Sequence, residues 1–257
     1  MRLLIPVLFF ILTGCVQLAP FRTELPRQSV ACVNCPEAPA DSEHSIREST
    51  DRYDLYFVEF DDQGLQYPAE MFCDKDRPCE EPQCDRKRND CLNTPAAAYQ
   101  INNMIKQLNQ TLSGDQWKGM SLVVFIHGWK HNAQFNDPNL KGFRQLLENA
   151  ASIEKEQGTG RRVAGLYVGW RGQSIDIPYL ENITFWSRKT AALHVAQGSS
   201  RELFARLRGF KCIQNSRDQK EGERNCNGPA SEGQRVKVVL IGHSFGALVL
   251  STRFLDR

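Results

Sequence analysis

The residues with the clearest capacity for chemistry form a five-residue turn, Gly242-His243-Ser244-Phe245-Gly246. The turn follows an apolar run at 236–241 that predicts a strand, and it precedes an apolar segment from Ala247 that predicts a helix. A side chain at the apex of such a turn is held in a strained conformation clear of the backbone, and the helix start favours negative charge beside it. The pattern predicts a nucleophilic Ser244; the alternative is a structural turn in an unrelated α/β protein.

A second strand end also carries residues suited to a site. The run Leu122–Ile126 is apolar without alternation, as expected for a strand buried on both faces of a parallel sheet, and His127-Gly128-Trp129 ends it. Ligands of open α/β sheets bind beyond the carboxyl ends of the strands. Both strand ends are therefore candidate parts of one site.

With both motifs in this order, the chain resembles the α/β-hydrolases, in particular bacterial serine hydrolases with an HGW loop and a GHSFGA elbow. The resemblance covers about residues 53–257, apart from inserts that contain cysteines. It implies that Ser244 attacks an acyl carbon and that the backbone amides of Trp129 and Phe245 stabilise the oxyanion. Each such amide lowers the activation barrier by about 3 kcal/mol. The implied substrates are carboxylic esters or related acyl compounds, small molecules or lipids, with neither a cofactor nor a metal.

The histidines near these motifs are candidates for the general base. His127 and His243 occupy motif positions that usually pack or form hydrogen bonds around the loop and the elbow, and His131 and His194 are weaker candidates. Farther along, the aromatic stretch 175–180 with Phe185-Trp186 could line an acyl pocket or pack in the core.

The resemblance also implies a catalytic acid and then a histidine after the serine. The thirteen residues after Ser244 contain Asp256 as their only acid and no histidine. We therefore expect a C-terminally truncated hydrolase that lacks its last strands, turns over p-nitrophenyl esters negligibly and is poorly soluble because the strand at 236–241 is left as an apolar edge. The alternative is a non-catalytic envelope lipoprotein, a pseudoenzyme or binding module, that retains part of the hydrolase fold.

The N-terminus predicts export. Met1-Arg2 is positively charged, an apolar run follows, and Leu12-Thr13-Gly14-Cys15 closes it, which resembles a bacterial lipoprotein signal at 1–14 with lipid attachment at Cys15. Several acyl chains would hold the protein firmly on a membrane. The alternative is an ordinary secretory signal with a coincidental cysteine. We expect a membrane-anchored protein of the bacterial cell envelope that faces the periplasm.

Cysteine usage and charge narrow the class of protein. The nine cysteines minus Cys15 leave an even number, which favours disulfides in inserts at about 72–92 and 210–230. A zinc site at 73–91 would lack paired two-residue spacings and a histidine. Cys32 and Cys35 have redox-pair spacing without the flanking strand and helix, so a local bridge is expected. The net charge of +2 argues against nucleic-acid binding, and no oligomeric state is indicated.

Strands and helices alternate along the chain, which predicts an α/β fold with a mostly parallel sheet and helices on both faces. Residues 15–50 have the composition of a lipid-anchored tether, and 51–257 form the partial hydrolase domain. The expected strands are 53–60, 122–126, 163–170 and 236–241. Helices are expected to begin at Thr94-Pro95, at Asp137-Pro138 and at Ala247, and a further helix is expected between 187 and 208 with an interruption at Gly198. The helix that begins at Asp137-Pro138 has one apolar stripe: Phe143, Leu146, Leu147, Ala150 and Ile153.

Overall fold

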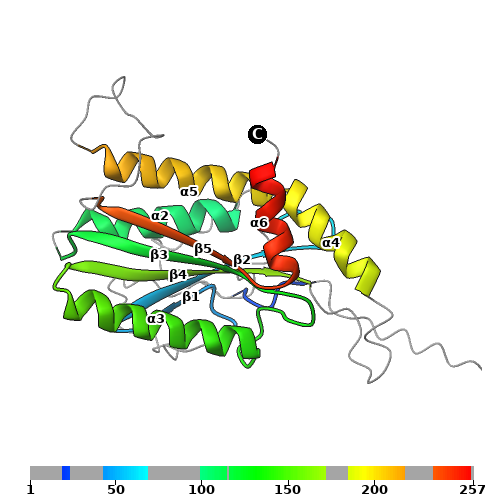
Figure 1. Cartoon of the computed structure of the whole chain (residues 1–257), viewed down its shortest axis with the longest axis horizontal. Helices are drawn as coiled ribbons and strands as arrows, with labels where there is room; N and C mark the ends of the chain where they lie inside the picture. The colour runs from blue at the N-terminus through cyan, green and yellow to red at the C-terminus, as the bar shows by residue number, and fades with distance from the viewer. Residues whose placement is uncertain are drawn as a thin grey trace, which may run out of the picture.

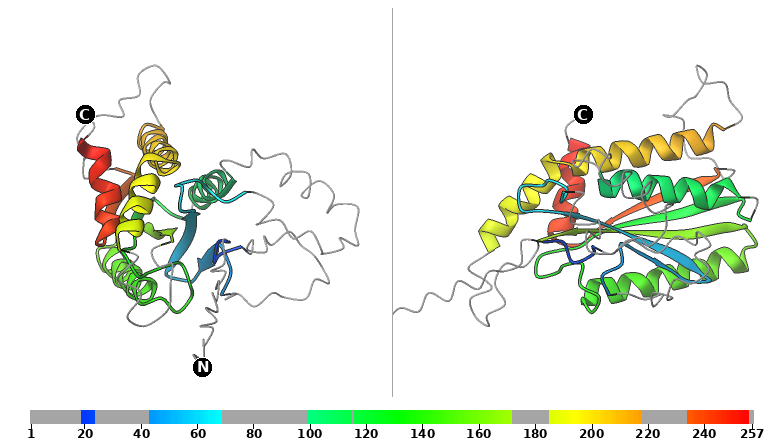
Figure 2. Two further views of the ribbon diagram at one scale, coloured as in Figure 1. Left: turned by 90° about the vertical axis from the view of Figure 1, so that its right-hand side faces the viewer. Right: turned by 180° about the vertical axis from the view of Figure 1, so that it is seen from behind.

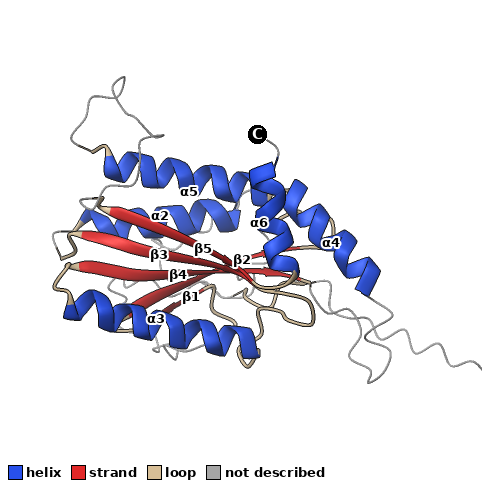
Figure 3. Ribbon diagram, viewed as in Figure 1, coloured by secondary structure: helices blue, strands red, loops and turns tan. Residues whose placement is uncertain are grey.

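The structure is a computed structural model that describes residues 19–23, 43–68, 99–114, 116–171, 185–217 and 234–255. These residues form one five-stranded sheet with helices packed on it (Figures 1 and 3). The strands are β1 (Arg47–Ser49), β2 (Tyr53–Phe60), β3 (Gly119–Ile126), β4 (Arg161–Trp170) and β5 (Val236–Gly242), and the helices are α2 (Tyr99–Ser113), α3 (Pro138–Glu156), α4 (Phe185–Gln197), α5 (Ser200–Asn215) and α6 (Phe245–Leu255).

The sheet has the order β1-β2-β4-β3-β5. The pairs β2–β4, β4–β3 and β3–β5 are parallel, and only β1 pairs antiparallel, with β2. The strands β2 and β4 consist almost wholly of buried residues because both of their faces are covered, and most of their residues are apolar or aromatic. An α/β fold with a mostly parallel sheet is therefore present, as predicted.

Alternate residues of the four parallel strands contribute to two cores on opposite faces of the sheet. One core joins residues such as Val124 and Leu166 to α2, α4, α5 and α6. The other joins Val123 and Tyr167 to Leu140, Phe143 and Leu147 of α3. The left view of Figure 2, in which the sheet is seen end-on, shows α3 on one face and the other described helices opposite. The prediction of helices on both faces is confirmed.

The predicted start of α3 is confirmed, but its predicted stripe is partly wrong. The Asp137 side chain accepts hydrogen bonds from the backbone N–H groups of Asn139 and Leu140, which makes it the N-cap. Leu146 and Ile153 lie on one flank of the buried stripe and are 37% and 52% exposed. The apolar surface of the helix is wider than the part that the sheet covers.

The predicted interruption at Gly198 separates α4 from α5. The Gly198 N–H donates to the carbonyl of His194, and the Ser199 N–H leaves the helix to donate to the carbonyl of Gly64, at 2.8 Å. The chain turns there because the loop after β2 supplies the acceptor.

Part of the predicted tether packs against the sheet. The strand β1 and the short segment 19–23 both fall within residues 15–50, and Arg22 is among the largest fully buried side chains. Sequence periodicity missed β1 because three residues are too few to show an alternation.

Candidate functional site

Ser244 lies between the end of β5 and the start of α6, at the carboxyl end of the sheet. A strained conformation was predicted for it; its φ is 53°, in the left-handed region, and the residue is exposed. Backbone hydrogen bonds from Gly246 to His243 (2.8 Å) and from Ala247 to Ser244 (2.9 Å) hold the turn. A Cβ atom on Gly246 would lie 2.1 Å from the carbonyl oxygen of Ile126, so only glycine allows the start of α6 to approach the end of β3 this closely.

The loop after β3 packs directly against this turn. A Cβ atom on Gly128 would lie 2.8 Å from both the Ser244 Cβ and the His243 carbonyl oxygen, so the Gly128 backbone abuts the serine. The rings of Trp129 and Phe245, whose amides are the predicted oxyanion donors, have centroids 6.5 Å apart. The structure thus brings together the two motifs that the sequence singled out.

His127 is a buried structural residue. Its Nε2 accepts a hydrogen bond from the Trp170 backbone N–H at 2.9 Å, which leaves Nδ1 to donate to the Gly128 carbonyl at 2.9 Å. The ring stacks between Tyr167 and Trp170, and it is almost parallel to the indole, with an interplanar angle of 5°. Burial lowers its pKa to about 4. With both ring nitrogens engaged and no exposed surface, His127 cannot take a proton from Ser244.

Two other histidines lie close to Ser244: His243 within the turn and His131 beside it. The Nδ1 of His131 is 3.1 Å from a carboxylate oxygen of Asp137, and the rings of His131 and His243 meet edge-on with centroids 5.7 Å apart. His243 is exposed, and its Nδ1 is 3.0 Å from Asn139 Oδ1. The pairing of His131 with Asp137 was not predicted, because Asp137 was interpreted only as a helix cap. His194 lies away from this turn on α4, and its Nδ1 is 3.1 Å from the Asp62 carbonyl oxygen.

A buried acid at the same end of the sheet was also missed. Glu59 is the penultimate residue of β2, and its carboxylate accepts hydrogen bonds from the backbone N–H groups of Phe21 (3.1 Å) and Arg22 (2.8 Å). Burial raises the pKa of Glu59 to about 7, against these bonds and the Arg22 charge, which lower it. The available signal was an acid near the carboxyl end of a strand in which every residue except Asp54 and Glu59 is apolar or aromatic.

Several predicted features lie outside the described residues. These are Cys15, the cysteines of the insert at 72–92, Cys32 and Cys35, and the stretch 175–180. Cys212 on α5 is disulfide-bonded. In the described ranges no His, Cys, Asp and Glu side chains gather into a potential metal site. None of the helices described here combines the length and apolar character that crossing a bilayer requires.

Comparisons of the chain with protein-family models, with curated proteins and with solved structures gave no match. The interpretation of the site therefore depends on the geometry above and on the sequence motifs.

Proposed function

We propose that the protein is a serine hydrolase of the α/β-hydrolase type that acts on carboxylic esters or related acyl compounds. The observation that carries the proposal is Ser244 itself. It is an exposed serine with a left-handed backbone conformation at the carboxyl end of a parallel strand, and a helix starts at the next residue. Strained non-glycine residues of this kind are concentrated at functional sites. An α/β sheet binds its ligands at this edge.

In the proposed reaction, the Ser244 Oγ forms a bond to the acyl carbon while its proton passes to a general base. The backbone amides of Trp129 and Phe245 stabilise the negative charge on the carbonyl oxygen. The alcohol leaves with a proton, and water then attacks the acyl-enzyme and releases the carboxylic acid and the free serine. Because His127 is buried, we assign it a structural role and not that of the general base.

The proposed location is the bacterial cell envelope, with a lipid anchor at Cys15. The sequence Leu12-Thr13-Gly14-Cys15 supports it, and the disulfide at Cys212 agrees with an oxidising compartment. Cells fed an alkyne-tagged fatty acid should label the wild-type protein. A Cys15→Ser variant should remain unlabelled, and equal labelling of the two would contradict the anchor.

A fluorophosphonate probe tests the proposed activity. It is applied to the protein expressed from its own complete gene, so that the result does not depend on the truncation expected from the sequence. We expect the probe to label Ser244, as mapped by mass spectrometry, and we expect Ser244→Ala to remain unlabelled. Ser251→Ala is the matched control, since Ser251 is an exposed serine on α6 that should leave labelling unchanged. A folded wild-type protein that does not react with the probe would contradict the hydrolase and favour the non-catalytic lipoprotein.

A further inference from the structure

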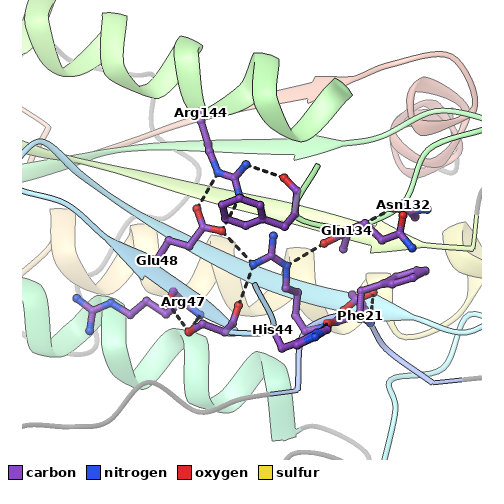
Figure 4. A network of polar contacts seen from close by, with 12 residues as sticks. Phe21, His44, Arg47, Glu48, Asn132, Gln134 and Arg144 are labelled. Atoms are coloured by element: carbon purple, nitrogen blue, oxygen red, sulfur yellow. Dashed lines mark hydrogen bonds and ion pairs between the residues drawn. The ribbon is translucent and has the colours of Figure 1, made fainter. Parts of the chain in front are cut away.

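Residues 19–23 form a strap, a short segment that lies beside the carboxyl end of β2. The Glu59 carboxylate receives the backbone N–H groups of Phe21 and Arg22, and the Thr23 N–H donates to the His44 carbonyl at 2.8 Å. The His44 Nδ1 lies 3.0 Å from the Phe21 carbonyl oxygen, which fixes the strap from its other side (Figure 4). The strap is thus held on both edges of its backbone.

Arg22 extends from the strap into the protein, and its side chain is 0% exposed. Its Nε donates to the carbonyl oxygen of Ala133 at 2.8 Å, and its Nη1 lies 3.0 Å from Glu48. The guanidinium lies over the Phe57 ring, 4.0 Å from the centroid. Ala133 belongs to the loop 127–137, which also carries Trp129, so the side chain connects the strap to the loop proposed to stabilise the oxyanion.

A second arginine, Arg144, also connects Glu48 to the loop 127–137. Arg144 of α3 makes a two-pronged contact with Glu48, at 2.8 and 2.7 Å, and it donates to the carbonyl oxygen of Phe135 at 2.9 Å. Glu48 therefore pairs with two guanidinium groups, each of which donates to a carbonyl of the same loop (Figure 4). A planar guanidinium can make such contacts in several fixed directions at once, which a lysine cannot.

We propose that Arg22 is a positioning residue for the site: the strap sets the position of the loop 127–137, and through it that of the Trp129 amide beside Ser244. The residue touches no reacting atom and acts through the Ala133 carbonyl. Because a displacement of a catalytic group by about 1 Å can reduce a rate about a hundredfold, loosening this loop should slow the reaction of Ser244. The inference has a structural half, that the strap holds the loop in place, and a catalytic half, that this placement speeds the reaction of Ser244. Only the catalytic half rests on the proposed function.

Limited trypsin digestion under native conditions tests the structural half. Lys130 lies in the loop and Lys106 is exposed on α2, so cleavage after Lys130 reports on the loop and cleavage after Lys106 reports on unfolding of the domain. In Arg22→Ala we expect cleavage after Lys130 to be at least tenfold faster than in the wild type, with little change after Lys106. Arg47→Ala is the matched control, because Arg47 contacts Asp54 and Tyr56 and does not touch the loop.

Arg22→Lys keeps the charge and most of the volume, so it provides a second variant should the alanine variant fail to fold. We expect cleavage after Lys130 to be several-fold faster in Arg22→Lys than in the wild type, with little change after Lys106. The proposal is overturned if Lys130 remains equally protected in Arg22→Lys and the wild type, or if cleavage after Lys130 and Lys106 rises in parallel.

The rate of fluorophosphonate labelling tests the catalytic half in the protein expressed from its own gene. Labelling of Ser244 should be at least tenfold slower in Arg22→Lys than in the wild type and in Arg47→Ala. An unchanged labelling rate in Arg22→Lys overturns the positioning role. If the wild type itself does not react, the proposed function fails, and digestion after Lys130 still decides whether the strap holds the loop.

Discussion

Ser244 combines a positive φ of 53° with an exposed side chain. For a residue with a Cβ atom this conformation costs on the order of 1 kcal/mol, so it persists only where the surroundings impose it. Here the turn bonds of Gly246 and Ala247 and the abutting backbone of Gly128 impose it. The strain can be measured without any assumption about a substrate.

We expect Ser244→Gly to be about 1 kcal/mol more stable than Ser244→Ala. Glycine adopts a positive φ without penalty, whereas alanine retains the strain of the serine. Urea unfolding measures the difference. At Ser251, in the interior of α6, the order should be reversed because glycine destabilises a helix by about 1 kcal/mol relative to alanine. The same order at both positions would contradict a strained Ser244.

Glu59 should make the free energy of unfolding depend on pH. Burial raises its pKa from 4.5 to about 7, so between these values the folded protein holds a proton that the unfolded chain releases. The resulting stabilisation is complete below pH 4.5 and is lost as the pH rises through 7, with each unit of pKa difference contributing about 1.4 kcal/mol. Glu59→Gln removes this dependence.

The measurement is urea unfolding of both proteins from pH 4.5 to 8. We expect the wild type to lose stability relative to Glu59→Gln as the pH rises. The lowered pKa of His127, about 4, has the opposite effect, since its contribution is lost as the pH falls below 6.5; it is common to both proteins and cancels in the comparison. Glu148→Gln, a substitution of a partly exposed carboxylate, should follow the wild type. Parallel curves for the wild type and Glu59→Gln would disprove the shift.

At the scale of the elements, runs rich in apolar, aromatic and β-branched residues predicted the four parallel strands, and Asp137-Pro138 predicted the start of α3. These features are local, or they follow from burial on both faces. The strap was not predictable, because arginine is a residue type that is mostly exposed and a single buried one leaves no pattern. The same holds for the contact between His131 and Asp137, which depends on how a loop folds back.

The serine turn and its loop were predicted for a related reason. Strand ends in a parallel sheet meet at one edge, so two motifs that each end an apolar run are expected to converge. The sequence could not show which groups hold the loop in place, since Glu48 and Arg144 are brought to Arg22 only by the folded sheet.

Across the whole molecule, the proposed site and the strap lie at the same end of the sheet. Ala19 begins the described strap and follows Cys15 by four residues, which span at most about 14 Å. A lipid anchor at Cys15 would therefore hold this end of the sheet close to the membrane. An ester embedded in a bilayer would then be more accessible to Ser244 than it would be to a site on a long tether.

Lengthening this connection should separate membrane-bound substrates from soluble ones. Inserting about 20 Gly/Ser residues after Leu18 extends the connection by roughly 25 Å on average and leaves the strap and Arg22 unchanged. In the anchored protein expressed from its own gene, we expect hydrolysis of an ester in vesicles to fall several-fold and turnover of a water-soluble p-nitrophenyl ester to stay the same. An equal loss on both substrates would indicate a damaged site, and no loss on either would show that the short connection has no part in substrate access. A Cys15→Ser version of both proteins, which lacks the anchor, is the control in which the insertion should make no difference to either substrate.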